Sequence, residues 1–359
     1  MSSLLKCITF CFLLWAISSC KSHPTVVQRG FYYWKNNRYL DYSDIGLMRK
    51  AAPEKLYIKF FEVEKDPTLR AIPVAKTEFD LFDEYYRSRV KYDSVLEKIC
   101  NHIEVIPTVF IRNEVLANVS YWDLDVLADN IWYLINRYYK ARFSNAPEAF
   151  NEIQIDCDWT ISTRKNYFYL LQKIKSLSGK TISCTLRMYP FAYPDTMGVP
   201  PVDKATLMCY NLIGTFDERN RNSILDTKEL EAYLKIAKVY PLHLDVALPV
   251  YAWSLVYQNN VFAGVINQPM MHGDVVYRQD TPLWYEVQSD TIINEFFLRP
   301  GDQIKYESVS DETIHEAIVL LNQYLNYDDT ITVSLFHLDA NMLNTYDSTS
   351  IDNFYSAFK

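Results

Sequence analysis

The chain has 359 residues, a formal net charge of −8 and a hydrophobic fraction of 49%. The acidic balance and the lack of a basic run argue against a nucleic-acid-binding protein, so no nucleic-acid partner is expected. Aromatic residues make up 15% of the chain, with 28 Tyr and 19 Phe, whereas Gly occurs only 8 times. This length suits a large α/β domain with an insertion rather than a small single core.

The N-terminal segment is typical of an export signal. Lys6 precedes an apolar run from Cys7 to Ser19, which is shorter than the roughly 20 residues that a membrane span needs. The sequence Ile-Ser-Ser-Cys ending at Cys20 is similar to the lipobox of bacterial lipoproteins, in which this cysteine carries the lipid. We therefore expect an exported, membrane-anchored lipoprotein of the bacterial cell envelope. An ordinary signal peptide cut near Ser22 is the alternative.

The remaining cysteines give no indication of a metal site. Cys100, Cys157, Cys184 and Cys209 lack C-x-x-C pairs and histidines at zinc-ligand spacing, so no zinc or other cofactor is predicted. Their apolar neighbours favour buried free thiols over disulfides.

Strand-like and helix-like segments alternate from residue 30 onward. The predicted strands are Gly30–Trp34, Lys55–Val63, Val105–Ile111, Glu152–Trp159, Thr181–Tyr189, Ala205–Asn211, Leu242–Trp253 and Thr330–Leu338. The predicted helices are Tyr42–Ala51, Glu78–Asn101, Ser120–Phe143, Thr163–Leu177, Thr227–Val239 and Glu312–Tyr324. Because strands joined by helical crossovers pair in parallel, the pattern predicts an α/β fold, a (β/α)8 TIM barrel.

The segment from Ser254 to Ser310 interrupts this alternation after the seventh strand. It carries short runs typical of strands, at Val275–Tyr277, Trp284–Val287, Phe296–Leu298 and Gln303–Glu307. Loops of this length without secondary structure are uncommon. The expected organisation is therefore a signal peptide (1–19), a lipidated tether (20–29), a barrel (30–253 and 311–359) and an antiparallel insertion domain (254–310).

The C-terminal ends of barrel strands are where chemistry is expected in this fold. Aromatic, carboxylic, amide and cationic side chains gather at these predicted ends: Trp34, Glu62, Arg112, Asp156, Asp158, Thr160, Arg187, Tyr189, Tyr210, Asn211, Tyr251, Trp253, His337 and Asp339. Flat apolar faces beside carboxylates and amides are typical of a sugar site. For any single residue, core packing or a surface ion pair is the commoner alternative, so the prediction depends on the set.

Two acids and a hydroxyl follow one another at alternate positions of the fourth predicted strand. Because side chains alternate faces, Asp156, Asp158 and Thr160 would point into the barrel and Cys157 toward the helices. Two carboxylates on one face need a shared proton or a cation, and Arg187 on the next strand is the candidate cation. A satisfied polar layer without a ligand is the alternative. A metal site joining both acids to His337 and Asp339 has no supporting motif, so no metal is predicted.

Three segments resemble motifs of the family 18 glycoside hydrolases. "IDCDWT", ending at Thr160, is similar to the family's D-G-x-D-x-D-W-E strand. "MCYN", ending at Asn211, is similar to M-x-Y-D/N, and "LPVYAW", ending at Trp253, is similar to G-L-P-x-Y-G. The insertion after the seventh strand also falls where many chitinases of the family carry a small α+β domain. The resemblance covers the barrel from Glu152 onward and the first three strands by topology only; an uncharacterised bacterial lipoprotein barrel family of this shape is a further possibility.

The resemblance implies a substrate-assisted site for N-acetylated sugars, an exception to the two-carboxylate scheme. Asp158 would orient the acetamide, Asp156 would be its buried partner, and Tyr210 would assist. The family's proton-donating Glu corresponds to Thr160, and a hydroxyl cannot deliver a proton near neutral pH as a carboxylic acid can. At the end of the eighth strand, where the family has a Trp, this chain has Phe336 and His337.

Three functions remain open on the sequence alone, and whether the protein is an enzyme is among the open points. The first is a lipid-anchored protein that binds N-acetyl-containing glycans with little or no standard hydrolysis. The second is an active glycosidase whose proton donor has moved, with Glu62 or Asp339 as candidates. The third is a non-catalytic scaffold that uses the insertion domain. An open, acid-lined pocket would favour the first two, and a mouth closed by aromatic side chains would favour the third.

Overall fold

The computed structural model describes residues 23–35, 40, 42–81, 93–143, 149–216, 219–267, 277–293 and 295–359. The predicted signal peptide and Cys20 lie outside the described residues. Within the part of the chain that the structure describes, no helix is long and apolar enough to cross a membrane.

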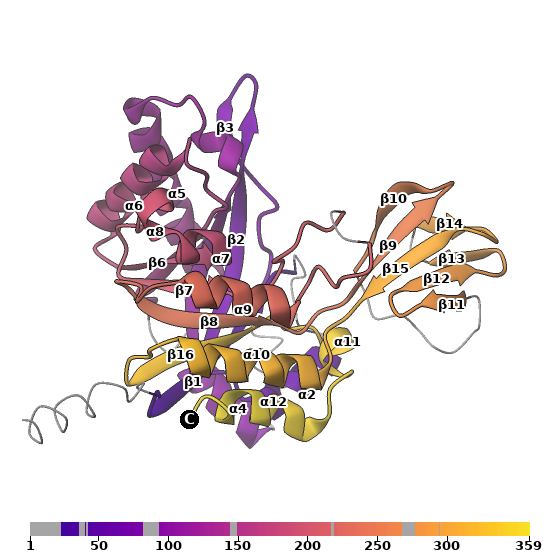
Figure 1. Ribbon diagram of the computed structural model, residues 1–359. Coiled ribbons are helices and arrows are strands. Elements are labelled where there is room, and N and C mark those ends of the chain that lie inside the picture. Colours follow the sequence, from indigo (N-terminus) through magenta and orange to yellow (C-terminus); the bar gives the residue numbers. More distant parts are fainter. Residues whose placement is uncertain are drawn as a thin grey trace, which may run out of the picture.

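Eight parallel strands close into a barrel, as predicted (Figure 1). In barrel order they are β1 (Val26–Tyr33), β2 (Lys55–Asp66), β4 (Glu104–Ile111), β5 (Glu152–Asp156), β6 (Thr181–Arg187), β7 (Lys204–Met208), β8 (His243–Pro249) and β16 (Thr330–Phe336). β16 pairs with β1 and completes the ring. Because β1 begins at Val26, four residues assigned to the tether belong to the barrel.

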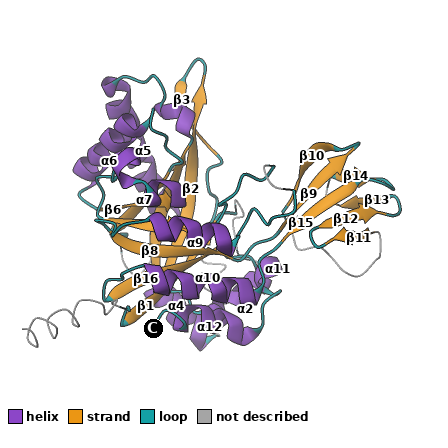
Figure 2. Ribbon diagram, in the orientation of Figure 1, coloured by secondary structure: helices purple, strands orange, loops and turns teal. Residues whose placement is uncertain are grey.

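Helices surround the barrel (Figure 2). The longer ones are α2 (Tyr42–Ala51), α4 (Ser94–His102), α5 (Tyr121–Arg142), α6 (Arg164–Ser178), α9 (Thr227–Ile236), α10 (Asp311–Tyr324) and α12 (Ser348–Ser356). Short turns of helix are η1 (Asn113–Leu116), α7 (Met188–Ala192), α8 (Pro194–Met197) and α11 (Ala340–Leu343). The side chains of Ser120, Asp226 and Ser310 accept backbone N–H groups at the starts of α5, α9 and α10, as N-cap residues do.

The helix predicted over Glu78–Asn101 is wrong at its start. Residues 78–81 are not helical, residues 82–92 lie outside the described part, and α4 begins only at Ser94. The carboxylate of Asp93 accepts the backbone N–H groups of Val95 and Leu96. This cap defines the N-terminus of α4 and explains the shorter helix.

A strand that the sequence did not predict, β3 (Arg70–Val74), extends β2 as an antiparallel hairpin. It pairs with β2 alone among the described strands of the barrel sheet. Pro73 is compatible with this position because an edge strand does not need every backbone donor.

The segment after β8 forms a separate β-sheet that projects from the barrel (Figure 2). β9 (Trp253–Gln258), β10 (Val261–Ile266), β11 (Tyr277–Thr281), β12 (Trp284–Val287) and β15 (Gln303–Glu307) are antiparallel, and β13 (Thr291–Ile293) pairs with β14 (Phe296–Leu298). Their side chains bury a core of their own, formed by Val256, Ile266, Val287, Leu298 and Ile304. The described residues of this insertion form antiparallel strands, as expected of an antiparallel insertion domain.

Candidate functional site

Polar side chains of β5 enter the barrel interior. The amide of Gln154 accepts from Tyr32 Oη at 2.8 Å and donates to Thr206 Oγ1 at 3.1 Å. Two residues further on, Asp156 accepts from Thr185 Oγ1 at 2.6 Å. Cys157 is buried near Tyr167 of α6. The predicted register is therefore present as far as Cys157.

The acid–acid–hydroxyl row does not continue along the strand. β5 ends at Asp156, so Asp158 and Thr160 belong to the connection that leads into α6. Thr160 is exposed, and its hydroxyl lies 2.8 Å from Ser162 Oγ and 3.2 Å from Thr163 Oγ1. The prediction that all three residues lie on one strand is therefore wrong: Asp158 stays close enough to Asp156 for its charge to raise the pKa of that acid, whereas Thr160 turns away toward Ser162 and Thr163.

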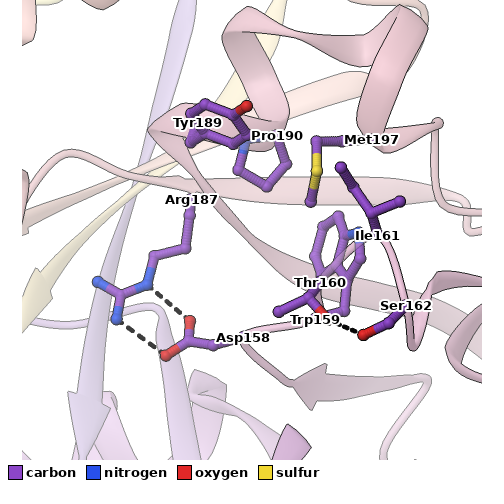
Figure 3. A pocket seen from close by; sticks show the side chains of 9 residues that line it. All are labelled: Asp158, Trp159, Thr160, Ile161, Ser162, Arg187, Tyr189, Pro190 and Met197. Carbon is purple, nitrogen blue, oxygen red and sulfur yellow. Dashed lines mark hydrogen bonds and ion pairs between the residues drawn. The ribbon is translucent and has the colours of Figure 1, made fainter.

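Asp158 pairs with Arg187, the cation that the sequence predicted for it. Arg187 at the end of β6 donates from Nε and Nη2 to the two carboxylate oxygens of Asp158, at 2.6 and 2.9 Å (Figure 3). Burial lowers the pKa of Arg187, but the hydrogen bond and charge of Asp158 outweigh it and raise the pKa overall. The pair is partly open to solvent, with 49% of the Asp158 side chain and 32% of the Arg187 side chain exposed.

Asp156, below this pair, has an unusual proton affinity. Burial and the charge of Asp158 raise its pKa from 3.8 to about 6, although Thr185 and Arg187 act in the opposite direction. A buried carboxyl next to a second carboxylate retains its proton to higher pH. The two acids therefore differ in environment, one buried and one exposed to the cavity.

A cavity of about 680 Å³ opens beside the ion pair. Its lining consists of Asp158, Trp159, Thr160, Ile161, Ser162, Arg187, Tyr189, Pro190 and Met197. In Figure 3 the charged pair lies at one end, and Trp159, Pro190 and Met197 lie toward the other. The cavity therefore presents both charged and apolar surfaces to a ligand.

An aromatic group lies at the barrel mouth around Phe336, which the sequence analysis had noted only as a replacement for Trp. The ring centroid of Phe336 is 5.4 to 5.7 Å from the rings of Tyr32, Trp34, Tyr210 and Tyr251. Three of the predicted site aromatics thus lie together. The sequence signal that could have identified Phe336 is its place at the end of the last barrel strand.

Tyr210 and its neighbours differ in how their polar atoms are satisfied. Tyr210 Oη is buried and has no hydrogen-bond partner among the described residues, and burial raises its pKa. Tyr251 Oη donates to Asn211 Oδ1 at 2.8 Å. Trp253 Nε1 donates to Glu307 of the insertion at 2.6 Å. Trp253 begins β9 of the insertion sheet, so the predicted seventh strand, Leu242–Trp253, is wrong at its end: β8 stops at Pro249.

The two candidate displaced proton donors lie in ion pairs. Glu62 accepts from Lys59 Nζ at 2.6 Å, and Asp339 lies 3.0 Å from Lys35 Nζ. Both lysines were missed by the sequence analysis, because neither occurs in a recognisable motif. Next to Asp339, burial lowers the pKa of His337 to about 4, so this imidazole is neutral near pH 7.

Tyr189 and Arg112 lie at the outer rim. Tyr189 is 47% exposed and its ring centroid is 4.8 Å from that of Tyr193. Arg112 pairs with Glu64 at 2.7 Å. Within the described ranges, no three His, Cys, Asp or Glu side chains are grouped as metal ligands.

The closed (β/α)8 barrel carries carboxylates, an arginine and aromatic rings at the C-terminal ends of its strands, where this fold has its binding and catalytic sites. No protein-family model matches the chain, and no curated protein matches it. Among solved structures, the chain is similar to the spore cortex-lytic enzyme SleL of Bacillus cereus, with 14% identity, a TM-score of 0.54 and coverage of 95% of this chain and 76% of that one. SleL of Bacillus megaterium QM B1551 gives 13% identity, the same TM-score and the same coverage.

The GH18 chitinase ChiB from the chitin utilization locus of Flavobacterium johnsoniae is also similar, with 12% identity, a TM-score of 0.47 and coverage of 94% of each chain. At such identities the similarity shows the fold. The similarity to the two SleL structures agrees with the predicted barrel fold.

Proposed function

We propose that this protein binds N-acetyl-containing glycans at the mouth of its barrel, with little or no standard hydrolysis, and that lipid at Cys20 anchors it in the cell envelope. The observation that carries the proposal is Thr160. It stands where the resembling family has its proton donor, while Asp156, Asp158 and Tyr210 are retained at the same mouth. A hydroxyl does not replace a carboxylic acid of raised pKa as general acid.

The surroundings of the mouth support a sugar ligand. Tyr32, Tyr210 and Tyr251 of the aromatic group are buried, while Trp34 and Phe336 are half-buried and leave some ring surface exposed. The buried hydroxyl of Tyr210 has no partner among the described residues. Leaving such a hydroxyl unsatisfied costs free energy, so a ligand carbonyl or amide that bonded to it would be favoured. An acetamide group provides both an acceptor and a donor.

The two alternatives have less support. A displaced proton donor would have to act from Glu62 or Asp339, and each is engaged by a lysine. A scaffold agrees with the packed aromatic group around Phe336, but it does not account for the cavity of about 680 Å³ beside that group, which Asp158 and Arg187 line.

The test is a binding titration of residues 21–359 with N-acetylated oligosaccharides and their deacetylated counterparts, with reducing-sugar release measured in parallel. We expect binding that depends on the acetyl groups, weakened by Asp158→Asn and by Tyr210→Phe, and marginal release. Robust release that survives those two changes but disappears with Glu62→Gln or Asp339→Asn would show that the protein is a glycosidase with a displaced proton donor and not a binding protein.

The proposed anchor would keep the barrel close to the membrane. β1 begins at Val26, and an extended chain spans at most about 3.5 Å per residue, so the link from Cys20 covers roughly 20 Å. Cys20→Ala should abolish incorporation of radiolabelled fatty acid, because lipidation requires the thiol. Continued labelling of that variant would show that the anchor assignment is wrong.

A further inference from the structure

A second cavity lies away from the barrel mouth, between the β2–β3 hairpin and α5 (Figure 1). Its volume is about 910 Å³, which is within the range of pockets that hold small molecules. Its lining shares no described residue with the lining of the cavity beside Asp158 and Arg187. The two cavities are therefore separate sites.

The cavity exists because the hairpin continues the barrel sheet beyond the neighbouring strand. β2 aligns with β4 as far as Val63, which is opposite Ile111 at the end of β4. Its pairing with β3 goes on to Asp66. On the face that lines the cavity, β3 contributes Ala71 and Pro73. Because these side chains are small, they leave space between the hairpin and α5.

The floor of this cavity is apolar, and part of its wall is exposed. Phe61, Leu127 and Ile131 line it and are buried. Trp122 and Val126, one turn apart on α5, also line it and are 68% and 41% exposed. Exposed apolar surface that is gathered in a cleft indicates a binding site. Aliphatic side chains outnumber aromatic ones in the lining, which suits a hydrocarbon chain.

The rim of the cavity carries one unpaired positive charge. Lys65 is exposed, and within the described part of the chain no group pairs with its ammonium. The other cation of the lining, Arg70, donates to Asp123. The carboxylate of Asp66 accepts two backbone N–H groups of the hairpin turn. The rim therefore matches a ligand that carries a single negative charge.

We propose that this cavity binds a hydrocarbon chain that ends in one carboxylate. The chain lies on the apolar floor, and the carboxylate pairs with Lys65. A carboxylate carries one charge near neutral pH, whereas a phosphate monoester carries nearly two. The inference goes beyond the proposed glycan site and does not depend on it.

The lipid proposed at Cys20 is too far away to be this ligand. Gly30 of β1 aligns with Lys55 of β2, so Lys65 lies about 46 Å from Val26 along the strands, at about 3.3 Å per residue. The link from Cys20 to Val26 covers only roughly 20 Å. The ligand therefore comes from outside the chain.

The first experiment titrates wild-type protein of residues 21–359 with octanoate, decanoate and dodecanoate by calorimetry, below the concentrations at which they form micelles. Decanol and decyltrimethylammonium are the matched neutral and cationic chains. We expect the affinity of the carboxylates to rise about fourfold per added methylene group, because each one is buried. Decanoate should bind about twofold to fivefold more tightly than decanol, which is the size of an exposed ion pair, and the cation should bind most weakly.

Absence of binding by the wild type, or an affinity that does not change with chain length, overturns the inference and leaves the glycan site untouched. Decanol or the cation binding as tightly as decanoate overturns the choice of a carboxylate. Sedimentation equilibrium tests a second copy of the chain as the occupant. A wild-type dimer that Val126→Glu converts to a monomer would assign the cavity to self-association and overturn the inference.

Variants at exposed positions then locate the site. Val126→Glu places a charge in the cavity and should lower the affinity for decanoate at least about tenfold, since a charged group disfavours an apolar chain beside it. Val319→Glu makes the same change at a valine of α10 that is 63% exposed and lies outside the lining, and it should leave the affinity unchanged. Equal affinities of these two variants overturn the location.

A second pair of variants tests the carboxylate contact. Lys65→Gln should bring the affinities for decanoate and decanol together, whereas Lys140→Gln, on α5 but outside the lining, should leave their ratio as in the wild type. A preference for decanoate that persists in Lys65→Gln, or that Lys140→Gln removes to the same extent, overturns the role given to Lys65.

Discussion

At the scale of single residues, the site combines a retained acid pair with a replaced proton donor. Thr160 lines the same cavity as Asp158, so a carboxyl group introduced there lies beside the sugar site. General acid catalysis contributes about 100- to 10,000-fold, and misplacement by about 1 Å removes about 100-fold. We therefore expect Thr160→Glu to release aryl groups from an activated N-acetylated aryl glycoside at a rate measurably above that of the wild type.

Two controls accompany this variant. Asp158→Asn in the Thr160→Glu background should remove the gain, because the acetamide is no longer oriented. Ser162→Glu places a carboxyl on the same cavity without matching the family's donor position and should give no gain. A gain of equal size in Ser162→Glu, or one that survives Asp158→Asn, would contradict the assigned roles.

The sequence located individual site residues better than it located their contacts. Alternation along β5 predicted the inward direction of Asp156, and adjacency of strands predicted Arg187 as the neighbour of Asp158. It did not reveal that the strand stops at Asp156, because the turn depends on hydroxyl contacts among Thr160, Ser162 and Thr163. The lysines that bind Glu62 and Asp339 come from positions that no motif distinguishes. Lys59 lies three residues before Glu62 on β2, whereas the closed barrel brings Lys35, after β1, to Asp339, after β16.

At the scale of elements, a buried ion pair joins the insertion to the barrel. Lys305 and Glu307 of β15 lie 2.8 Å apart and are almost fully buried. Glu307 also accepts from Ser223 N, Ser223 Oγ and Trp253 Nε1. The carboxylate thus connects the insertion sheet to the loop after β7 and to the start of β9.

Removing this carboxylate should destabilise the insertion strongly. Glu307→Ala removes the carboxylate that Lys305, Ser223 and Trp253 share, and losing one member of a buried pair costs about 3–5 kcal/mol. Urea unfolding followed by tryptophan fluorescence measures the loss. Glu286→Ala, which removes a more exposed pair with Arg278 on the same sheet, should change stability by less than about 1 kcal/mol. Equal effects of the two changes would contradict the role given to Glu307.

Element prediction succeeded for one helix and three short strands of the insertion, and failed where a cap or an edge position decided. α2 was predicted with its observed bounds, and β12, β14 and β15 of the insertion likewise. β3 was missed because Pro73 argues against a strand, although an edge strand tolerates it. The start of α4 was misplaced because the cap at Asp93 outweighed the apolar periodicity upstream.

At the scale of the whole molecule, buried charges lie at both ends of the barrel. At the N-terminal end, His243 contacts Asp245 at 3.1 Å and Asp328 at 2.5 Å, and Lys204 pairs with Glu152 and Asp245. The hydrogen bond to Asp245 raises the pKa of His243 above 6.5, despite an opposing effect of burial. The folded state therefore binds this proton more tightly than the unfolded state does.

Protonated His243 therefore stabilises the folded state. The stabilisation is complete below the pKa of His243 in the unfolded state and is lost as the pH rises through its higher pKa in the folded state. His243→Gln removes the contribution. We expect the stability advantage of the wild type over this variant to be constant below about pH 6 and to shrink as the pH rises beyond about 6.5. Thermal unfolding across this range measures it, and an advantage that grows with pH would contradict the ion-pair assignment.

Asp156, at the opposite end of the barrel, affects stability over a lower pH range. Its pKa of about 6 in the folded protein exceeds the ordinary value of 3.8. The folded state is therefore most stable when Asp156 is protonated, and its stability falls as the pH rises from about 4 to about 6. Asp156→Asn retains an acceptor for Thr185 and cannot ionise. Over this pH range the free energy of unfolding of the variant should rise relative to that of the wild type by on the order of 3 kcal/mol, since one pKa unit corresponds to about 1.4 kcal/mol.

Urea unfolding of both proteins at several pH values measures this difference, in which contributions from all other acids cancel. If the difference did not change between about pH 4 and pH 6, ionisation of Asp156 would not destabilise the folded state. A rising difference would instead show that the barrel keeps a destabilised carboxyl beneath Asp158. The position of a buried acid under a ligand-facing one is what the proposed site requires, because the pair then holds a single negative charge below neutral pH.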